Sequence, residues 1–277
     1  MWTAENRGRY DRSQLRYPSD LTDDEWAHAA PAIRPAKRGG NRRHVDMREV
    51  MNGIMYILST GCQWRAIPKD LPPRSTLYDY FDLWSWDGTL ERIHHALFVE
   101  CREREEREAS PTAAIIDSQS VKSAEKGGAH DPHGYDAGKK IKGKKRHILV
   151  DTLGLLLSAA VHSADIQDRD GAALVLDERT RALFPFILRI FADAGYRGAH
   201  AALAAARSGD WIIEIVQRNE LHTFVVLPKR WIVERTIAWL NRCRRLAKDW
   251  ENLNRKALAF LRLASIRLML RKLCNPV

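Results

Sequence analysis

Apolar residues recur at helical spacing through the first hundred residues of the chain. The clearest case covers residues 46–59, where apolar side chains three and four positions apart predict a helix with one buried face, ended by Gly61. Thr22, followed three residues later by a glutamate, is a capping-box pattern and predicts an earlier helix start. Two more helices are expected after a proline-rich break, one capped by Ser75 and one covering about 89–108.

Beyond residue 109 the pattern changes to short apolar runs that alternate with helical segments. The runs expected to form strands are 113–116, 146–151, 155–162, 188–192, 211–216 and 223–226. The segments expected to form helices are 170–182, 198–207, 229–250 and 255–272. This order predicts an α/β fold with a mixed sheet flanked by helices, since that layout buries all of these elements.

The change of pattern places a domain boundary at about residue 109. Residues 1–20 are expected to form an N-terminal arm, and residues 21–108 an all-helical domain. The short connections of that domain are compatible with a helix-turn-helix DNA-binding unit, although a helical subdomain that only packs is an equally good interpretation. Residues 109–277 are expected to form the α/β domain, with basic helices at its C-terminal end.

Composition narrows the class of protein. Of the 277 residues, 45% are hydrophobic and 29% are charged, which is typical of a globular protein. No apolar run approaches the roughly 18 residues that a membrane span needs, and the N-terminus is too polar for a secretory signal, so we expect a cytoplasmic protein. The four cysteines lack the close spacing of zinc sites and disulfide frameworks, and we expect reduced thiols.

The basic charge is concentrated in one segment. The net charge is +10, and residues 229–272 hold thirteen Lys and Arg against three acids, which accounts for the whole surplus. This indicates a polyanion-binding surface, with a solvated helix face as the alternative. A second basic run is expected to contact phosphates, and its members are Lys139, Lys140, Lys142, Lys144, Lys145 and Arg146.

Three carboxylates are candidates for chemistry. Asp117 and Asp193 each follow an apolar run, and ligand-binding groups gather beyond the carboxyl ends of strands in α/β sheets. Glu234 lies in the basic segment, where a salt bridge with Arg230 is the better interpretation if it is considered alone. Together the three fit phosphodiester chemistry, because two Mg²⁺ ions held by carboxylates activate the attacking water and stabilise the leaving oxygen.

A second acidic cluster competes for the metal role. It consists of Asp165, Asp168 and Asp170, close to His162, which is itself a candidate ligand. We favour a different interpretation, in which Asp168 and Asp170 cap the next helix and pair with Arg169.

At this point the sequence resembles a known family, the transposases of the insertion-sequence-five family. The resemblance covers nearly the whole chain, in order. It is carried by the segments LRYPSDLTDDEWA, KRGGNRR, GCQWRAIPKDLPPRSTLYDYF, IIDSQSVK, GYDAGKKIKGKKRHILVDTLGLLL, ADIQDRDGA, FADAGYRG and FVVLPKRWIVERTIAWLNRCRRLAKDWE.

The resemblance implies a ribonuclease-H-like catalytic core, a helical DNA-binding region and a DDE active site. Asp117 and Asp193 match the two catalytic aspartates, Glu234 the glutamate, and Arg230 the arginine of its motif. The tyrosine of that motif is replaced by Leu227, and its lysine by Asn241, with Arg242 adjacent. The side chains expected at the DNA surface, besides the basic run, are Arg38, Arg42, Arg43, Arg74, Arg230, Trp231, Arg235 and Arg242.

We therefore expect a DNA transposase that uses two Mg²⁺ ions, with Mn²⁺ as a substitute. It would bind the inverted-repeat ends of an insertion sequence, cleave there, and transfer the 3′-hydroxyl end to target DNA. The resemblance also implies a homodimer or larger assembly on DNA. The alternatives are a catalytically inactive DNA-binding remnant or repressor of the element, and a plain nuclease without strand transfer.

Overall fold

The structure is a computed structural model in which two compact units are recognised. It describes residue 8, residues 10–35, residue 39 and residues 44–125, 131–216 and 230–275, without the side chain of Arg230. Unit 1 comprises Met1–Cys101, Arg242–Leu246 and Ala259–Val277, and unit 2 comprises Arg102–Asn241 and Ala247–Leu258. We expected residues 109–277 to form one domain. Two stretches of that range, Arg242–Leu246 and Ala259–Val277, instead belong to unit 1.

Unit 1 is all-helical, as expected. Its helices and 3₁₀ turns are α2 (Asp23–Ala29), η1 (Ala30–Ala32), α3 (Met47–Thr60), η2 (Trp64–Ala66), α4 (Arg74–Trp84), α5 (Thr89–Arg104, up to Cys101), η5 (Arg244–Leu246) and α10 (Asn254–Cys274, from Ala259).

The helix ends of unit 1 follow local sequence signals. The Thr22 hydroxyl accepts a hydrogen bond from the Glu25 amide at 3.1 Å, and the Glu25 carboxylate accepts one from the Thr22 amide at 3.0 Å. This capping box confirms the predicted start of α2. Gly61 ends α3 in the left-handed conformation, as predicted. The prediction for Ser75 was wrong, because α4 begins at Arg74 after Pro73, without a side-chain cap.

The connections in unit 1 bear on the helix-turn-helix interpretation. Twelve or more residues separate α3 from its described neighbours α2 and α4, whereas four residues, Ser85 to Gly88, separate α4 from α5. A helix-turn-helix has a turn of about three or four residues. The α4–α5 pair therefore has a suitable connection, and its DNA-binding role stays a prediction.

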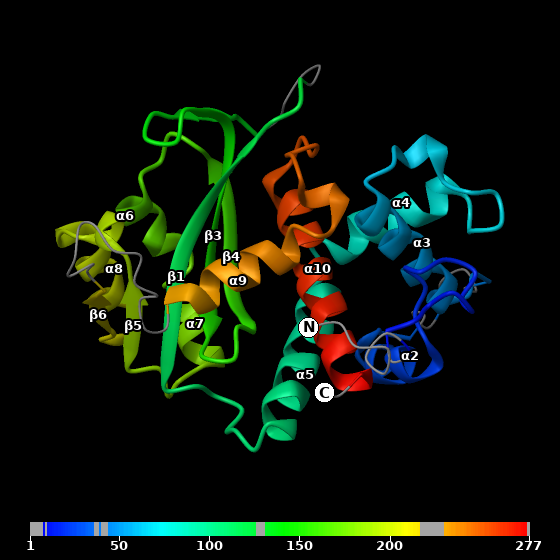
Figure 1. Ribbon diagram of the computed structural model, residues 1–277, viewed down its shortest axis with the longest axis horizontal. Helices are drawn as coiled ribbons and strands as arrows, with labels where there is room; N and C mark the ends of the chain where they lie inside the picture. The colour runs from blue at the N-terminus through cyan, green and yellow to red at the C-terminus, as the bar shows by residue number, and fades with distance from the viewer. Residues whose placement is uncertain are drawn as a thin grey trace. The chain divides into compact units, whose positions relative to one another are not determined.

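The described residues of unit 2 are built on a six-stranded mixed sheet (Figure 1). The strands are β1 (Ala113–Lys122), β2 (Gly134–Asp136), β3 (Ile141–Asp151), β4 (Leu156–Ser163), β5 (Arg189–Ala192) and β6 (Ile212–Ile215). The helical elements are α6 (Asp168–Gly171), η3 (Ala172–Leu174), α7 (Glu178–Leu183), η4 (Ala194–Tyr196), α8 (Ala199–Gly209) and α9 (Arg230–Leu240).

The pairing of these strands gives the sheet its mixed character. The order is β2-β3-β1-β5-β6. β4 also pairs with β3, on the edge opposite β1. β3 is antiparallel to β1, β2 and β4, whereas β5 is parallel to both β1 and β6. The ribonuclease-H-like α/β fold expected for this part of the chain is confirmed.

Long-range contacts moved several predicted boundaries in unit 2. β1 continues past Asp117, because β3 pairs with it as far as Lys122. The helix expected over 229–250 ends at Leu240, and Asp249 instead donates its amide to the Lys122 carbonyl at 3.0 Å. The helix expected over 170–182 is broken into α6, η3 and α7. The strand expected at 223–226 lies outside the described residues.

Two general expectations concern the whole chain. All four cysteines are unbridged, with Cys101 and Cys243 buried and Cys62 and Cys274 partly exposed. Across the described ranges, no helix combines the length and the apolar character that crossing a membrane would require.

Candidate active site

The two expected catalytic aspartates lie in and directly after neighbouring strands, at the carboxyl end of β5. In the parallel β1–β5 pair, Ile115 lies opposite Phe191. The same register, continued by two residues, places Asp117 opposite Asp193. β5 ends at Ala192, so beyond this point the β1 edge is open, and Asp193 starts the turn η4 by accepting a hydrogen bond from the Gly195 amide at 2.8 Å. Asp117 was expected at a strand tip and lies inside β1, although still at the carboxyl end of β5.

The two faces of β1 carry different side chains. Opposite residues of an antiparallel pair point to the same face, and Gln119 and Asp117 lie opposite Arg146 and Ile148. The guanidinium of Arg146 lies 3.5 Å from the side-chain oxygen of Asn241, the residue that follows α9. Asp117 therefore belongs to the sheet face that α9 covers, and α9 packs on β1 and β3.

Glu234 is exposed on α9. The helix is anchored through Thr236, whose hydroxyl lies 2.9 Å from the Gly154 carbonyl in the β3–β4 turn, and through the buried Val233. The helix that carries Glu234 thus lies on the sheet face to which Asp117 belongs, which is compatible with the expected carboxylate trio. Their convergence on one ion stays a prediction, and so does the pairing of Glu234 with Arg230.

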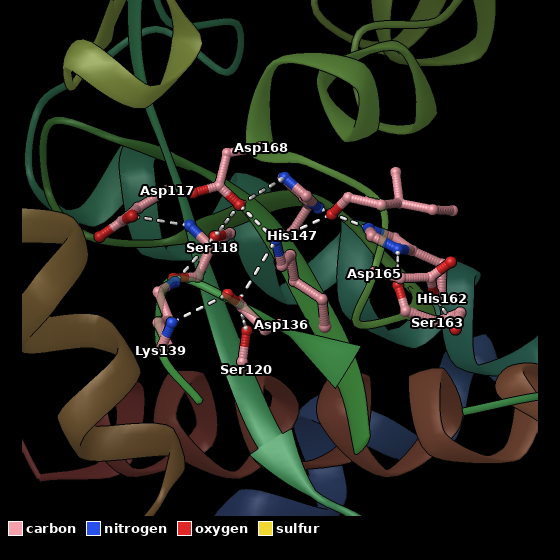
Figure 2. Close-up of polar contacts among 12 residues, drawn as sticks. Asp117, Ser118, Ser120, Asp136, Lys139, His147, His162, Ser163, Asp165 and Asp168 are labelled. Carbon is pink, nitrogen blue, oxygen red and sulfur yellow. Dashed lines mark hydrogen bonds and ion pairs between the residues drawn. The ribbon is translucent and has the colours of Figure 1, made fainter. Parts of the chain in front are cut away.

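A third aspartate, Asp168, is the first residue of α6 and bonds to Ser118, whose side chain points to the opposite face of β1 from Asp117. Figure 2 shows Asp168 and Ser118 with their polar contacts. One of the Asp168 carboxylate oxygens, Oδ1, accepts hydrogen bonds from Ser118 Oγ and Lys145 Nζ, both at 2.8 Å. Its other oxygen, Oδ2, lies 3.4 Å from the position that a Cβ on Gly195 would occupy, and Asp193 Oδ1 lies 3.0 Å from the same position. Asp168 and Asp193 therefore flank one point at the end of β5. The prediction that Asp168 caps a helix and pairs with Arg169 was wrong, because its partners are Ser118 and Lys145.

The rest of the second acidic cluster is dispersed. Asp165 accepts a hydrogen bond from Ser163, and Asp170 contacts His200 at 2.6 Å. Neither contact joins the site at the end of β5.

Two buried polar side chains border the aspartates. Tyr196 is 1% exposed, and burial together with the negative charges of Asp117, Asp168 and Asp193 raises the pKa of its hydroxyl far above the usual value. His147 is fully buried, and its Nε2 lies 4.0 Å from Asp168 Oδ1. Among the described residues, the Tyr196 hydroxyl and this nitrogen have no hydrogen-bond partner.

His147 and Tyr196 were not candidates at the level of sequence. Both depend on contacts between segments distant in the chain, and a single histidine or tyrosine gives no local signal of such contacts. His162, a candidate ligand, instead contacts His147 Nδ1 through its Nε2 at 2.7 Å.

The basic run is divided between the exposed turn and start of β3 and the covered remainder of that strand. Lys139, Lys140 and Lys142 are exposed, and Lys139 Nζ lies 3.2 Å from the Ser118 carbonyl. The next three side chains are buried against protein partners, with exposed fractions of 1% for Lys144, 4% for Lys145 and 4% for Arg146. They were expected to contact phosphates, and their burial leaves that prediction to the three exposed lysines.

A second set of expected DNA contacts lies on α9. Arg235 is stacked between two tryptophans, at 4.4 Å from the Trp231 ring and 4.6 Å from the Trp239 ring. Trp231 is 43% exposed. Arg74 and Arg242 are exposed in unit 1, whereas Arg38, Arg42 and Arg43 lie outside the described residues.

The residues at the end of β5 fit a hard divalent cation. Carboxylate oxygens are the ligands that Mg²⁺ and Mn²⁺ prefer, and the buried Tyr196 hydroxyl borders them. Within the described part of the chain, no three His, Cys, Asp or Glu side chains already form a complete metal site. A cation would thus have to draw the carboxylates together.

Comparisons with known proteins give two family matches and one similar protein. A family model described as a transposase DDE domain matches residues 108–269, and a model for transposases of the IS4/5 family matches residues 21–94. A 16.2 kDa uncharacterized protein of insertion element IS402 from Burkholderia cepacia is 28% identical over 109 residues, which cover 37% of this chain and 73% of that protein. No solved structure matches the chain.

Proposed function

Because the chain belongs to the family of transposases with a DDE domain, we propose that it binds the inverted-repeat ends of an insertion sequence, cleaves DNA there and transfers the freed 3′-hydroxyl end to target DNA. The observation that carries this proposal is the parallel β1–β5 register, which brings Asp117 and Asp193 to one strand end. The placement of Asp117 on the sheet face covered by α9 supports Glu234 as the third member.

In this proposal, Asp117, Asp193 and Glu234 hold two divalent cations. Bound Mg²⁺ or Mn²⁺ would activate the attacking oxygen and stabilise the leaving oxygen of the phosphodiester. The three carboxylates fix the positions of the cations and compensate their charge, and no side chain forms a covalent bond to DNA. Water is the nucleophile in cleavage, and the 3′-hydroxyl of the element is the nucleophile in strand transfer.

Exposed basic residues would hold the DNA backbone. Lys139 lies beside Ser118, next to the carboxylates, and Lys140 and Lys142 extend the same exposed surface. On α9, Arg235 and the exposed Trp231 offer a charged and a stacking contact. Arg230, Arg242, Arg74, Arg38, Arg42 and Arg43 complete the proposed DNA contacts. Joining two ends of an element to one target requires a dimer or larger assembly on DNA.

The test is cleavage of a duplex that carries the sequence flanking the gene, in the presence of Mg²⁺. We expect Asp117→Asn, Asp193→Asn and Glu234→Gln each to abolish cleavage while DNA binding, measured by gel shift, is retained. Glu214→Gln is the matched control, because Glu214 is an exposed acid on the edge strand β6. Cleavage that persists in one of the three variants would remove that residue from the site.

The product distinguishes the alternatives. A transposase joins the 3′-hydroxyl end to a second DNA, which a labelled end reports as a larger product on a denaturing gel. Cleavage without joining would indicate a plain nuclease. Binding without cleavage in the native protein would indicate a repressor or an inactive remnant.

A further inference from the structure

The family match and the sequence both point to three carboxylates, and the structure contains a fourth at the same strand end. Asp168 is separated in sequence from Asp117 and Asp193, yet its Oδ2 and Asp193 Oδ1 approach one point above Gly195. A cluster of acids alone is a weak argument, because like charges gather wherever solvent or lysines compensate them. The arrangement of the surrounding donors and acceptors gives a stronger one.

The two oxygens of Asp168 have different surroundings. Oδ1 is held by Ser118 and Lys145, and the Lys145 ammonium also donates to the Ile166 carbonyl at 2.8 Å and lies 3.5 Å from Asp136. These three acceptors match the three protons of the ammonium. The side of the carboxylate that faces Lys145 is therefore fully engaged, and the Oδ2 side faces Asp193.

The histidine pair beneath Asp168 places an acceptor at the site. The Ser163 carbonyl can only accept, so the proton of His162 is on Nδ1, 2.7 Å from that oxygen. His162 Nε2 then accepts from His147 Nδ1 at 2.7 Å, which leaves His147 Nε2 with a lone pair.

Two acceptors therefore face each other, because His147 Nε2 lies 4.0 Å from Asp168 Oδ1. The nitrogen is fully buried and has no hydrogen-bond partner among the described residues, and neither has the nearby Tyr196 hydroxyl. A buried polar atom without a partner is costly. A small polar species that contacts both His147 Nε2 and Asp168 Oδ1 would remove this cost. A hydrated divalent cation serves both, since Mg²⁺ keeps several waters that donate to acceptors.

We propose that Asp168 is a fourth acidic residue of the divalent-cation centre, acting beside Asp193, with Lys145 and Ser118 orienting its carboxylate and His147 accepting a hydrogen bond from the hydration shell of the ion. Asp117 and Glu234 lie on the α9 face of the sheet, and Asp168 lies on the α6 face. Asp193, at the end of β5, is common to both sides. The assignment rests on the proposed function, because it adds a residue to the same centre.

The test measures Mn²⁺ binding to the full chain by electron paramagnetic resonance, without any requirement for cleavage. Asp168→Asn should weaken Mn²⁺ binding by about 10–100-fold, the range seen when an outer-shell or supporting group of a metal site is lost. Asp170→Asn is the matched control, because Asp170 is on the same short helix and contacts the exposed His200 instead of the site. It should bind Mn²⁺ like the native protein.

Asp168→Asn also leaves Lys145 short of one partner and could unfold the protein. The second variant therefore combines Lys145→Met with Asp168→Asn, which removes both charges together. If this folded double variant loses Mn²⁺ affinity to a similar degree, the loss is due to the carboxylate. If either folded variant binds Mn²⁺ like the native protein, the proposal is overturned.

The proposed function fails in a different way. Were the native protein and Asp193→Asn to show equal Mn²⁺ binding, the Asp193 centre itself would be wrong. A loss in Asp193→Asn without a loss in Asp168→Asn would leave the centre intact and refute only the role of Asp168.

Discussion

Lys145 is the buried cation on which the α6 side of the site depends, and its replacement by methionine gives the sharpest test of this network. Its side chain is 5% exposed, and it contacts Asp168 at 2.8 Å and Asp136 at 3.5 Å. Methionine fills a similar volume and removes the charge. Removal of one partner from a buried ion pair costs about 3–5 kcal/mol, because the other charge stays buried. We expect Lys145→Met to lose about that much free energy of unfolding at pH 7.5.

The pH dependence of this loss follows from Asp168. Burial alone would raise the pKa of its carboxyl, but hydrogen bonds from Lys145 and Ser118 lower it below the ordinary value. In the unfolded chain the pKa of Asp168 is about 3.9, and at higher pH the ionised carboxylate stabilises the native protein. This stabilisation is lost as the pH falls through the lower pKa of the folded state. Without Lys145 the burial effect dominates and the folded pKa rises. The variant then recovers stability, relative to its value at pH 7.5, as the pH falls through that raised pKa.

Urea unfolding at pH 7.5 and at pH 5 measures both effects. Lys142→Met is the control, because Lys142 is exposed on the same strand, and it should change stability by less than about 0.5 kcal/mol. The difference between the two variants should be larger at pH 7.5 than at pH 5. Equal stability of Lys145→Met and Lys142→Met at pH 7.5 would refute the account of Lys145 as a buried, paired cation.

Two further predictions concern stability away from the site. Arg102→Met should destabilise the protein by about 3–5 kcal/mol in urea unfolding, because its guanidinium is the ion-pair partner of the fully buried Asp151, whereas the exposed Arg107→Met should be near neutral. Gly53→Ala should cost about 1–2 kcal/mol in thermal unfolding, because the added methyl would lie 2.5 Å from buried Leu77 and this overpacking outweighs the helix-propensity gain of about 0.5–1 kcal/mol. Gly138→Ala is its control, because the added methyl would make only an ordinary contact, 3.5 Å from Asp136, and an equal effect at both glycines would contradict the packing argument.

Elements governed by nearby residues could be predicted from the sequence. The start of α2 depends on Thr22 and Glu25, three residues apart, and the end of α3 depends on the left-handed Gly61. Such signals need no tertiary information. The apolar runs before Asp117 and Asp193 likewise indicated two buried strands, although not that the strands would be parallel neighbours.

Boundaries set by distant partners could not be predicted in this way. β1 extends to Lys122 because β3 offers an antiparallel partner along its whole length. α9 stops at Leu240, and the chain beyond it returns to the sheet, where Asp249 bonds to Ser123 Oγ at 2.7 Å and to the Lys122 carbonyl. Helical periodicity continues through this segment in the sequence, so only the tertiary contact reveals the break.

The same limit applies to the candidate site. Asp168 stands next to Arg169 in the sequence, and this neighbour suggested a local pair. Its actual partner, Lys145, is 23 residues away on β3. A carboxylate in a local ion pair and a carboxylate in a site look the same in the sequence. The contact between Asp168 and Lys145 on β3 distinguishes them here.

The alternation of β3 also changes the meaning of the basic run. Lys145 and His147 face α6 and Asp168, whereas Lys144 contacts Asp249 at 3.9 Å and Arg146 contacts Asn241 on the other face. Consecutive basic residues thus serve opposite sides of one sheet, where acids and carbonyls inside the protein engage them. The whole run therefore cannot be assigned to DNA binding, because a buried cation that is already paired gains little from a phosphate. The part of the run that remains available to a phosphate backbone is the exposed segment before β3 and at its start, which begins with Lys139 beside the carboxylates.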